Sequence, residues 1–223
     1  MNKFNNLRLY FDKRMKRIFL FGFISGFPWV LIGSALSLWL KENDLSRSTI
    51  GWAGLIFAVY AVNFLWAPLV DRLKIPYLTK KIGHRRGWIV LMQIIILLSL
   101  LVWSVINPTE NLALLITVGL IIAVASATQD ITVDALRIEQ INENEGKSMA
   151  AGAAMAVVGW WTGYKLGGVV ALFTAEFFQN LGIKDYWQAT FLILGFLIIL
   201  MNIGLMFVHE PIETDRQAKQ KET

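Results

Sequence analysis

Residues 48–72 read STIGWAGLIFAVYAVNFLWAPLVDR, an apolar run that ends in an Asp-Arg pair. Residues 48–70 contain no Asp, Glu, Lys or Arg. A helix needs about 20 apolar residues to cross a bilayer core of about 30 Å. The stretch is therefore long and apolar enough to span a membrane, and Asp71-Arg72 closes that helix.

Five further apolar runs of about this length occur along the 223 residues, and three of them also contain no Asp, Glu, Lys or Arg. Hydrophobic residues make up 56% of the chain and charged residues 17%, whereas an average soluble domain carries about 25% charged residues. One such run could be a buried helix of a soluble protein, but six favour a membrane protein. We predict an all-α polytopic membrane protein with one six-helix bundle over residues 18–208, preceded by a basic segment (1–17) and followed by a polar, disordered tail (209–223). The spans are expected near residues 18–40, 48–70, 88–106, 112–135, 148–174 and 187–208.

The distribution of positive charge predicts the orientation. With the N-terminus inside, 17 of the 21 Lys and Arg residues fall in cytoplasmic segments, and the outside loops hold only Lys41, Arg47 and Lys184. Because cytoplasmic loops are enriched in Lys and Arg, both termini are expected in the cytoplasm. Four tryptophans lie near the ends of runs, as expected for side chains at the membrane interface. They are Trp39, Trp88, Trp103 and Trp187.

The composition disfavours several other classes of function. The chain has no cysteine, and His84 and His209 lie in separate polar segments, so neither a thiolate nor a His-rich metal site is expected. The basic residues lie between apolar runs, which fits membrane loops rather than a nucleic-acid interface. We expect no cofactor, metal, nucleic-acid partner or catalytic residue. An intramembrane enzyme that uses Asp130 and Asp134 as acid and base is disfavoured because no G-x-G-D motif occurs.

The loop after the second run, APLVDRLKIPYLTKKIGHRRGW (67–88), carries a denser set of charges. Its middle lysines fit ordinary positive-inside residues. The Asp-Arg and Gly-x-Arg-Arg elements at its two ends suggest a charge network at the cytoplasmic rim, which could hold one helix bundle against another in one conformation. The residues assigned to this cytoplasmic gate are Asp71, Arg72, Gly83, Arg85, Arg86 and Arg137.

The stretch SATQDITVDALRIE (126–139) places Asp130 and Asp134 four residues apart, on one helix face. At about 1.5 Å per residue from Leu112, Asp130 lies about 27 Å along the helix and Asp134 about 33 Å. Asp130 is therefore just inside the bilayer core, where desolvation disfavours its charged form, and Asp134 is at the edge. An intramembrane ionisable residue suggests function, so both are candidates for proton coupling. The alternative is that both join the ion network at the rim.

Lys165 is the other charge within a run, about 26 Å from Ser148 on the opposite side of the membrane. Its long stem could carry the amine outward to the interface. It could instead face a water-filled cavity and hold an anionic group of a substrate.

Two runs carry glycines at four-residue spacing, which lets helix backbones approach closely. Tight packing without a direct role in function is the simplest interpretation. The glycines assigned to helix packing are Gly22, Gly26, Gly159, Gly163 and Gly167.

Taken together, these motifs resemble the AmpG-type muropeptide permeases, a branch of the major facilitator superfamily. The matching stretches run in order over residues 20–168: LFGFISGFPWVLIGSALSLWL, STIGWAGLIFAVYAVNFLWAPLVDR, GHRRGW, SATQDITVDALRIE and GKSMAAGAAMAVVGWWTGYKLGG. The chain departs from the family pattern at Asn63, where a basic residue is common, and at Lys165, where arginine is common. Lysine keeps the charge but loses the planar fork that grips a carboxylate.

The resemblance implies proton-driven import of anhydromuramyl peptides across the bacterial inner membrane. The implied partners are membrane lipid, protons and a small anionic glycopeptide, with Lys165, Gln129 and Asn63 contacting the substrate. Such transporters have at least twelve spans in two similar halves that rock around a midplane site, so a second six-helix half is expected, on another chain or as a missing C-terminal part. The alternatives are a carrier of another organic anion, such as acetyl-CoA, and a truncated or regulatory subunit that does not transport.

Overall fold

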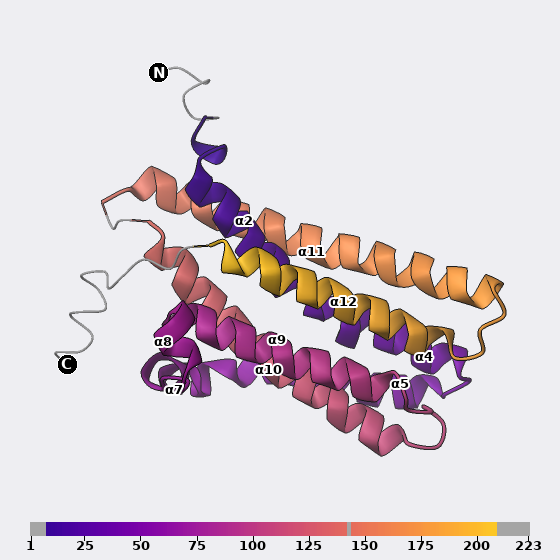
Figure 1. The fold of residues 1–223 in the computed structure, drawn as a ribbon. Coiled ribbons are helices and arrows are strands. Elements are labelled where there is room, and N and C mark those ends of the chain that lie inside the picture. Colours follow the sequence, from indigo (N-terminus) through magenta and orange to yellow (C-terminus); the bar gives the residue numbers. More distant parts are fainter. Residues whose placement is uncertain (1–7, 142–143, 209–223) are drawn as a thin grey trace.

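The computed structural model describes residues 8–141 and 144–208, which form helices and connecting turns without a strand. Six helical rods lie side by side, with neighbours in the chain running in opposite directions (Figure 1). The fold is thus the predicted all-α bundle. The predicted tail, residues 209–223, and residues 1–7 of the predicted basic segment lie outside the described residues.

Four rods are single helices, and the first two rods are built from shorter pieces. Rod one comprises α2 (Lys13–Gly26), α3 (Pro28–Val30), η1 (Leu31–Ala35) and α4 (Leu36–Glu42). Rod two comprises α5 (Arg47–Ala53), η2 (Gly54–Phe57), α6 (Ala58–Val62), η3 (Asn63–Leu65) and α7 (Ala67–Arg72), and α8 (Leu78–Ile82) lies in the loop that follows. The other rods are α9 (His84–Trp103), α10 (Leu112–Glu139), α11 (Gly146–Asn180) and α12 (Tyr186–Met206).

Five helical stretches of the described residues are long and apolar enough to cross a membrane by length and composition. They are Lys13–Glu42, Arg47–Leu65, His84–Trp103, Leu112–Glu139 and Tyr186–Met206. The rod α11 is not among them although it is 35 residues long. Glycines, polar-tipped aromatic residues and Lys165 lower its hydropathy, so its span across the membrane stays a prediction.

Rod one begins at Lys13, five residues before the predicted span, because Asp12 caps it. The Asp12 side chain accepts a hydrogen bond from the backbone N–H of Arg14, which satisfies one of the free donors at a helix start. Further along, Pro28 lacks a backbone N–H, and α2 gives way there to α3 and a π-helical turn over Leu31–Ala35. A proline and a π-turn are recognised causes of local distortion in a helix, and this distortion sits beside Trp29.

Rod two is irregular, and much of its surface is exposed. Two short 3-10 segments interrupt it, and it turns at Trp66 before α7 restarts with Pro68 in its first turn. Proline is favoured at that helical position because its missing donor would be unsatisfied in any case. Several apolar side chains on this rod are exposed, including Trp52, Leu55 and Phe64.

The tightest contact in the bundle joins α2 and α11, which run side by side (Figure 1). A Cβ atom built at any of four glycines would lie closer than 3.0 Å to backbone of the other helix; they are Gly22, Gly26, Gly159 and Gly163. At Gly167, a Cβ would meet the Phe27 and Val30 side chains at 2.9 Å. All five glycines assigned to packing from the sequence thus lie between rod one and α11, where small residues let helices approach closely.

The loops after α4, α9 and α11 lie at one end of the bundle (Figure 1), and three tryptophans near these helix ends are buried. Trp39, Trp103 and Trp187 are 1%, 0% and 1% exposed. The rings of Trp39 and Trp103 lie 4.9 and 5.1 Å from that of Phe191. The expectation that these three tryptophans face the membrane interface is therefore wrong, because the helices turn their rings inward against one another.

Candidate functional site

Asp130 is half-buried on α10, where that helix crosses α2. The Ser25 hydroxyl of α2 donates a hydrogen bond to its carboxylate. One residue earlier, Gln129 is fully buried and its Nε2 donates to the carbonyl of Ile24 at 3.0 Å. Two adjacent side chains of α10 are therefore hydrogen-bonded to two adjacent residues of α2.

Polar atoms without partners gather around Asp130. Trp29 lies close to its carboxyl group, and Tyr60 lies within range of its charge and beside Ser126. Among the described residues, no hydrogen bond reaches Trp29 Nε1, Tyr60 Oη or Ser126 Oγ, although all three atoms are buried. Buried polar atoms are normally satisfied, so this junction of α3, α6 and α10 has unused hydrogen-bonding capacity beside a carboxyl group.

Asp134 lies in a different environment from Asp130. Its side chain is 67% exposed, and its carboxylate pairs with Arg137 Nη2 at 3.1 Å on the same helix. An exposed pair of this kind contributes little to stability, typically less than about 1 kcal/mol. The two carboxylates of one helix face thus differ in exposure and in partner.

The loop between rod two and α9 is anchored by a buried arginine. Arg85, with 7% of its side chain exposed, forms ion pairs with Asp71 and with Glu139 of α10, the latter at 3.1 Å. The Glu139 side chain is 8% exposed, whereas that of Asp71 is 43% exposed. One guanidinium therefore joins α7, α9 and α10.

Neighbouring residues fix the same loop through backbone contacts. Arg86 donates to the carbonyl of Met206 at the end of α12, at 3.0 Å, and Trp88 Nε1 donates to the carbonyl of Leu73 at 3.0 Å. Gly83 caps α9 with φ of 100°, a left-handed conformation that glycine adopts without strain.

Two members of the predicted gate lie apart from this cluster. Arg72 is exposed and forms no ion pair within residues 8–141 and 144–208. Arg137 pairs with Asp134 of its own helix rather than with Asp71. In their place, the structure adds Glu139, which the sequence analysis missed although it lies in the quoted stretch one turn beyond Asp134.

A second ion pair joins rod one to α11 at the same end of the bundle. Arg14 donates from both terminal nitrogens to Glu145, at 3.0 and 3.1 Å, and Ser148 donates to the same carboxylate at 3.0 Å. Arg14 also pairs with Asp12. Partial burial acts to raise the pKa of Asp12, but hydrogen bonds and charge from Arg14 outweigh it and hold that pKa below its ordinary value.

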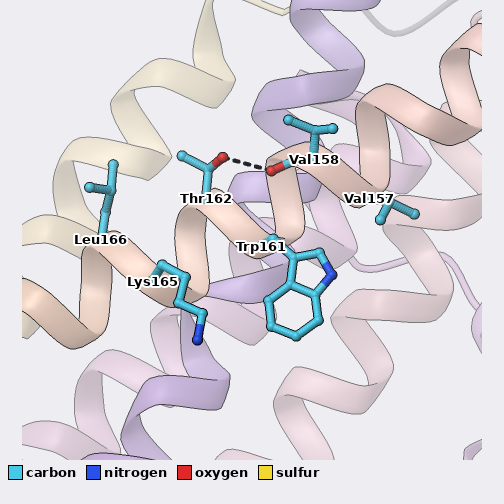
Figure 2. Close-up of a pocket in the computed structure, with 6 residues that line it drawn as sticks. All are labelled: Val157, Val158, Trp161, Thr162, Lys165 and Leu166. Carbon is cyan, nitrogen blue, oxygen red and sulfur yellow. Dashed lines mark hydrogen bonds between the residues drawn. The ribbon is translucent and has the colours of Figure 1, made fainter.

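Lys165 lies on a face of α11 away from the glycines. Its Nζ is 5.5 Å from the ring centre of Trp161 and 5.4 Å from that of Tyr164. Figure 2 shows its amine and the Trp161 indole projecting to the same side of α11, with Thr162 and Leu166 turned elsewhere. All residues around this shallow depression come from α11, so it is an open surface rather than an enclosed site.

The other two residues predicted to contact the substrate, Asn63 and Gln129, lie on other helices than Lys165. Asn63 is half-buried at the start of η3 in rod two. Gln129 has no exposed surface in this conformation. A direct contact between Gln129 and a substrate would therefore require α2 and α10 to separate, and its observed role is to join these helices.

Comparison with known proteins identifies the family. The family model described as Major Facilitator Superfamily matches residues 18–223. The chain belongs to the Major Facilitator Superfamily. Together with the apolar helices, this membership makes the chain a multi-pass membrane protein of a transporter family rather than an enzyme.

Relatives within the Major Facilitator Superfamily confirm the resemblance to AmpG-type transporters. The chain is 34% identical over 203 residues to "Putative transporter AmpG 4" of Rickettsia felis, covering 91% of this chain and 47% of that protein. It is 31% identical over 208 residues to "Anhydromuropeptide permease" of Escherichia coli K12, covering 93% of this chain and 40% of that protein. The chain spans about half the length of these curated relatives.

Proposed function

We propose that this chain is the N-terminal half of a proton-coupled permease that imports anhydromuramyl-peptide cell-wall fragments across the bacterial inner membrane. The observation that carries the proposal is Asp130, a half-buried carboxyl group on α10 where that helix crosses α2. It is hydrogen-bonded across the contact between α2 and α10. The similarity to an anhydromuropeptide permease supplies the substrate class.

Asp130 would carry the proton. A neutral carboxyl group is tolerated in a dry helix contact much better than a charged one, so protonation would allow the bundle to reorient with Asp130 enclosed. Release of the proton on the cytoplasmic side would restore the charge and favour the water-accessible conformation. The hydrogen bond from Ser25 supports the charged form, since a hydroxyl donates readily to a carboxylate.

The cluster around Arg85 would act at the cytoplasmic rim. Its observed ion pairs join helices of this half to one another, so they stiffen the half for rigid-body rocking. Because Asp71 keeps 43% of its side chain exposed, its carboxylate could also accept a donor from the second half. In that arrangement, the predicted gate combines the Arg85 ion pairs within this half with one contact from the Asp71 carboxylate to the second half.

The orientation proposed from the charge distribution has a direct test. The loops after α4, α9 and α11 lie together at one end of the bundle (Figure 1). Reporter fusions at Asn43, Asn107 and Lys184 should all report the periplasm. A cytoplasmic signal from any of them would contradict an inside N-terminus.

The proposed substrate is tested by uptake. The chain is expressed with the six-helix C-terminal half of a relative in a host that lacks its own permease, and uptake of labelled anhydromuramyl tripeptide is measured with and without a protonophore. We expect uptake that the protonophore abolishes and that excess acetyl-CoA does not inhibit. Inhibition by acetyl-CoA, with no muropeptide uptake, would instead support a carrier for another organic anion.

A further inference from the structure

The chain that leads into rod one carries exposed aromatic and basic side chains together, and we call residues 8–17 the entry segment. Residues 8–10 form a helical turn that ends before α2 begins at Lys13. Tyr10 and Phe11 are 39% and 73% exposed. A single exposed aromatic residue is ordinary on a protein surface, but these two lie among cations.

The first turns of α2 have one buried face and one charged face. Met15 and Ile18 are fully buried in the core, whereas Lys13 and Lys16 are exposed and Arg17 is half-buried. Lys13, Lys16 and Arg17 follow the spacing i, i+3, i+4, which places them side by side on the helix surface. The segment is therefore amphipathic, with basic residues on the side that the bundle leaves uncovered.

The acidic groups beside the entry segment are already paired. Arg14 binds Glu145 through both terminal nitrogens and Asp12 through Nε at 3.2 Å. The other four cations of the segment form no ion pair within residues 8–141 and 144–208; they are Arg8, Lys13, Lys16 and Arg17. The first turn of α2 holds no acidic residue, and the partial positive charge at a helix start disfavours cations there. An external anionic surface is thus the complementary partner.

The length of rod one places this segment at the level of the lipid headgroups. The rod covers 30 residues, Lys13–Glu42, which is about 45 Å at about 1.5 Å per residue. A bilayer is about 40–45 Å thick with its headgroups included. Residues 18–40 contain no Asp, Glu, Lys or Arg, so the last cations of the segment directly precede the apolar part of the rod. Figure 1 shows the start of the described chain at the end of the bundle opposite to the loops after α4, α9 and α11.

We propose that the entry segment binds a bilayer surface rich in anionic phospholipid, with Tyr10 and Phe11 inserted among the lipids and the four cations against the phosphate groups. Water would solvate the cations but would leave both aromatic rings exposed to it, whereas a lipid surface accommodates both. Interfacial segments of this composition bind through buried apolar area and attraction to anionic lipids. The contact goes beyond the proposed transport function and beyond the charge distribution that sets orientation, because it requires a particular class of lipid.

The test measures the environment of the segment in lipid nanodiscs. The chain contains no cysteine, so Tyr10→Cys provides a single attachment point for a nitroxide spin label while Phe11 stays in place. Collisions of the label with oxygen, which concentrates in lipid, are compared with collisions with a water-soluble nickel chelate. The lipids are phosphatidylcholine alone and an equimolar mixture with phosphatidylglycerol. We expect the label to move from water into lipid when phosphatidylglycerol is present, and to return to water in high salt, because salt screens exposed charges.

Two variants in the labelled background separate charge from apolar insertion. Lys13→Gln combined with Lys16→Gln should weaken docking of the segment on the mixed bilayer by more than about tenfold. Phe11→Ser should leave the label in water with both lipids. The matched control is Lys41→Gln, which removes an exposed cation at the other end of rod one and should change nothing. Far-ultraviolet circular dichroism checks that each variant keeps its helices.

Three results would overturn the proposal. The first is equal accessibility of the label in the two lipid compositions. The second is an equal effect of Lys41→Gln and of the double variant, which would indicate a response to net charge alone. The third is a label that becomes shielded only when the six-helix C-terminal half of a relative is added, whatever the lipid, which would assign the segment to that half. The measurement involves no substrate, so its outcome is independent of the proposed permease function.

Discussion

Replacing Asp130 with asparagine should abolish proton-dependent uptake by the assembled permease, with a loss on the order of 100-fold or more. Asparagine has nearly the same shape and keeps an oxygen that can accept the hydrogen bond from Ser25, so the α2–α10 contact should survive. It cannot take up or release a proton near neutral pH, so the coupled cycle should stop. The measurement is uptake of labelled anhydromuramyl tripeptide as a function of external pH in the two-half complex.

An assay of substrate exchange across the membrane distinguishes a loss of proton coupling from damage to the substrate site. Exchange of labelled for unlabelled substrate needs no net proton movement, so Asp130→Asn should retain it. Asp134→Asn is the matched control on the same helix, because its side chain is 67% exposed and pairs only with Arg137 among the described residues. Arg85→Gln should slow uptake without removing its pH dependence. Normal uptake at neutral pH by Asp130→Asn would show that this residue is not the coupling site.

Gly163→Ala should destabilise the bundle strongly. The added Cβ would lie closer than 3.0 Å to the backbone of Phe23 on α2, and backbone cannot move aside as a flexible side chain can. Overpacking of this kind typically lowers the free energy of unfolding by about 1–3 kcal/mol. The measurement is the thermal unfolding midpoint of the purified chain in detergent.

Gly168 provides the control, five residues further along the same helix. A Cβ there meets no atom within 4 Å, so Gly168→Ala should be neutral or should stabilise the helix by up to about 1 kcal/mol. Equal unfolding midpoints for Gly163→Ala and Gly168→Ala would contradict the close contact between α2 and α11.

Local spacing was enough to anticipate the features that depend on a single helix. The charge-free run at residues 48–70 indicated a membrane helix, and the four-residue spacing of Gly159 and Gly163 indicated a packing face. The spacing of Asp130 and Asp134 placed both on one face. The rise per residue counted from Leu112 predicted that Asp130 is less accessible to water than Asp134. These inferences needed only the helix repeat and the thickness of a bilayer.

Contacts between helices far apart in the sequence could not be anticipated in the same way. Glu139 meets Arg85 across 54 residues, and no spacing rule links them. Ring contacts join Trp29 to Tyr60 and to Trp160; these residues come from three different rods, and a single sequence gives no register between rods. The buried Trp39 illustrates the same limit, since its position near a helix end does not reveal which way its ring points.

We propose that this chain supplies one half of a transport path in which Asp130 carries the proton. Uptake of labelled anhydromuramyl tripeptide tests it most directly, in a host without its own permease, for the 223-residue chain alone and for the chain with a six-helix C-terminal half from a relative. We expect the chain alone to insert in the membrane without uptake, and the pair to take up substrate in a proton-dependent manner. Robust proton-dependent uptake by the chain alone would contradict the claim and would show that copies of this chain can supply both halves.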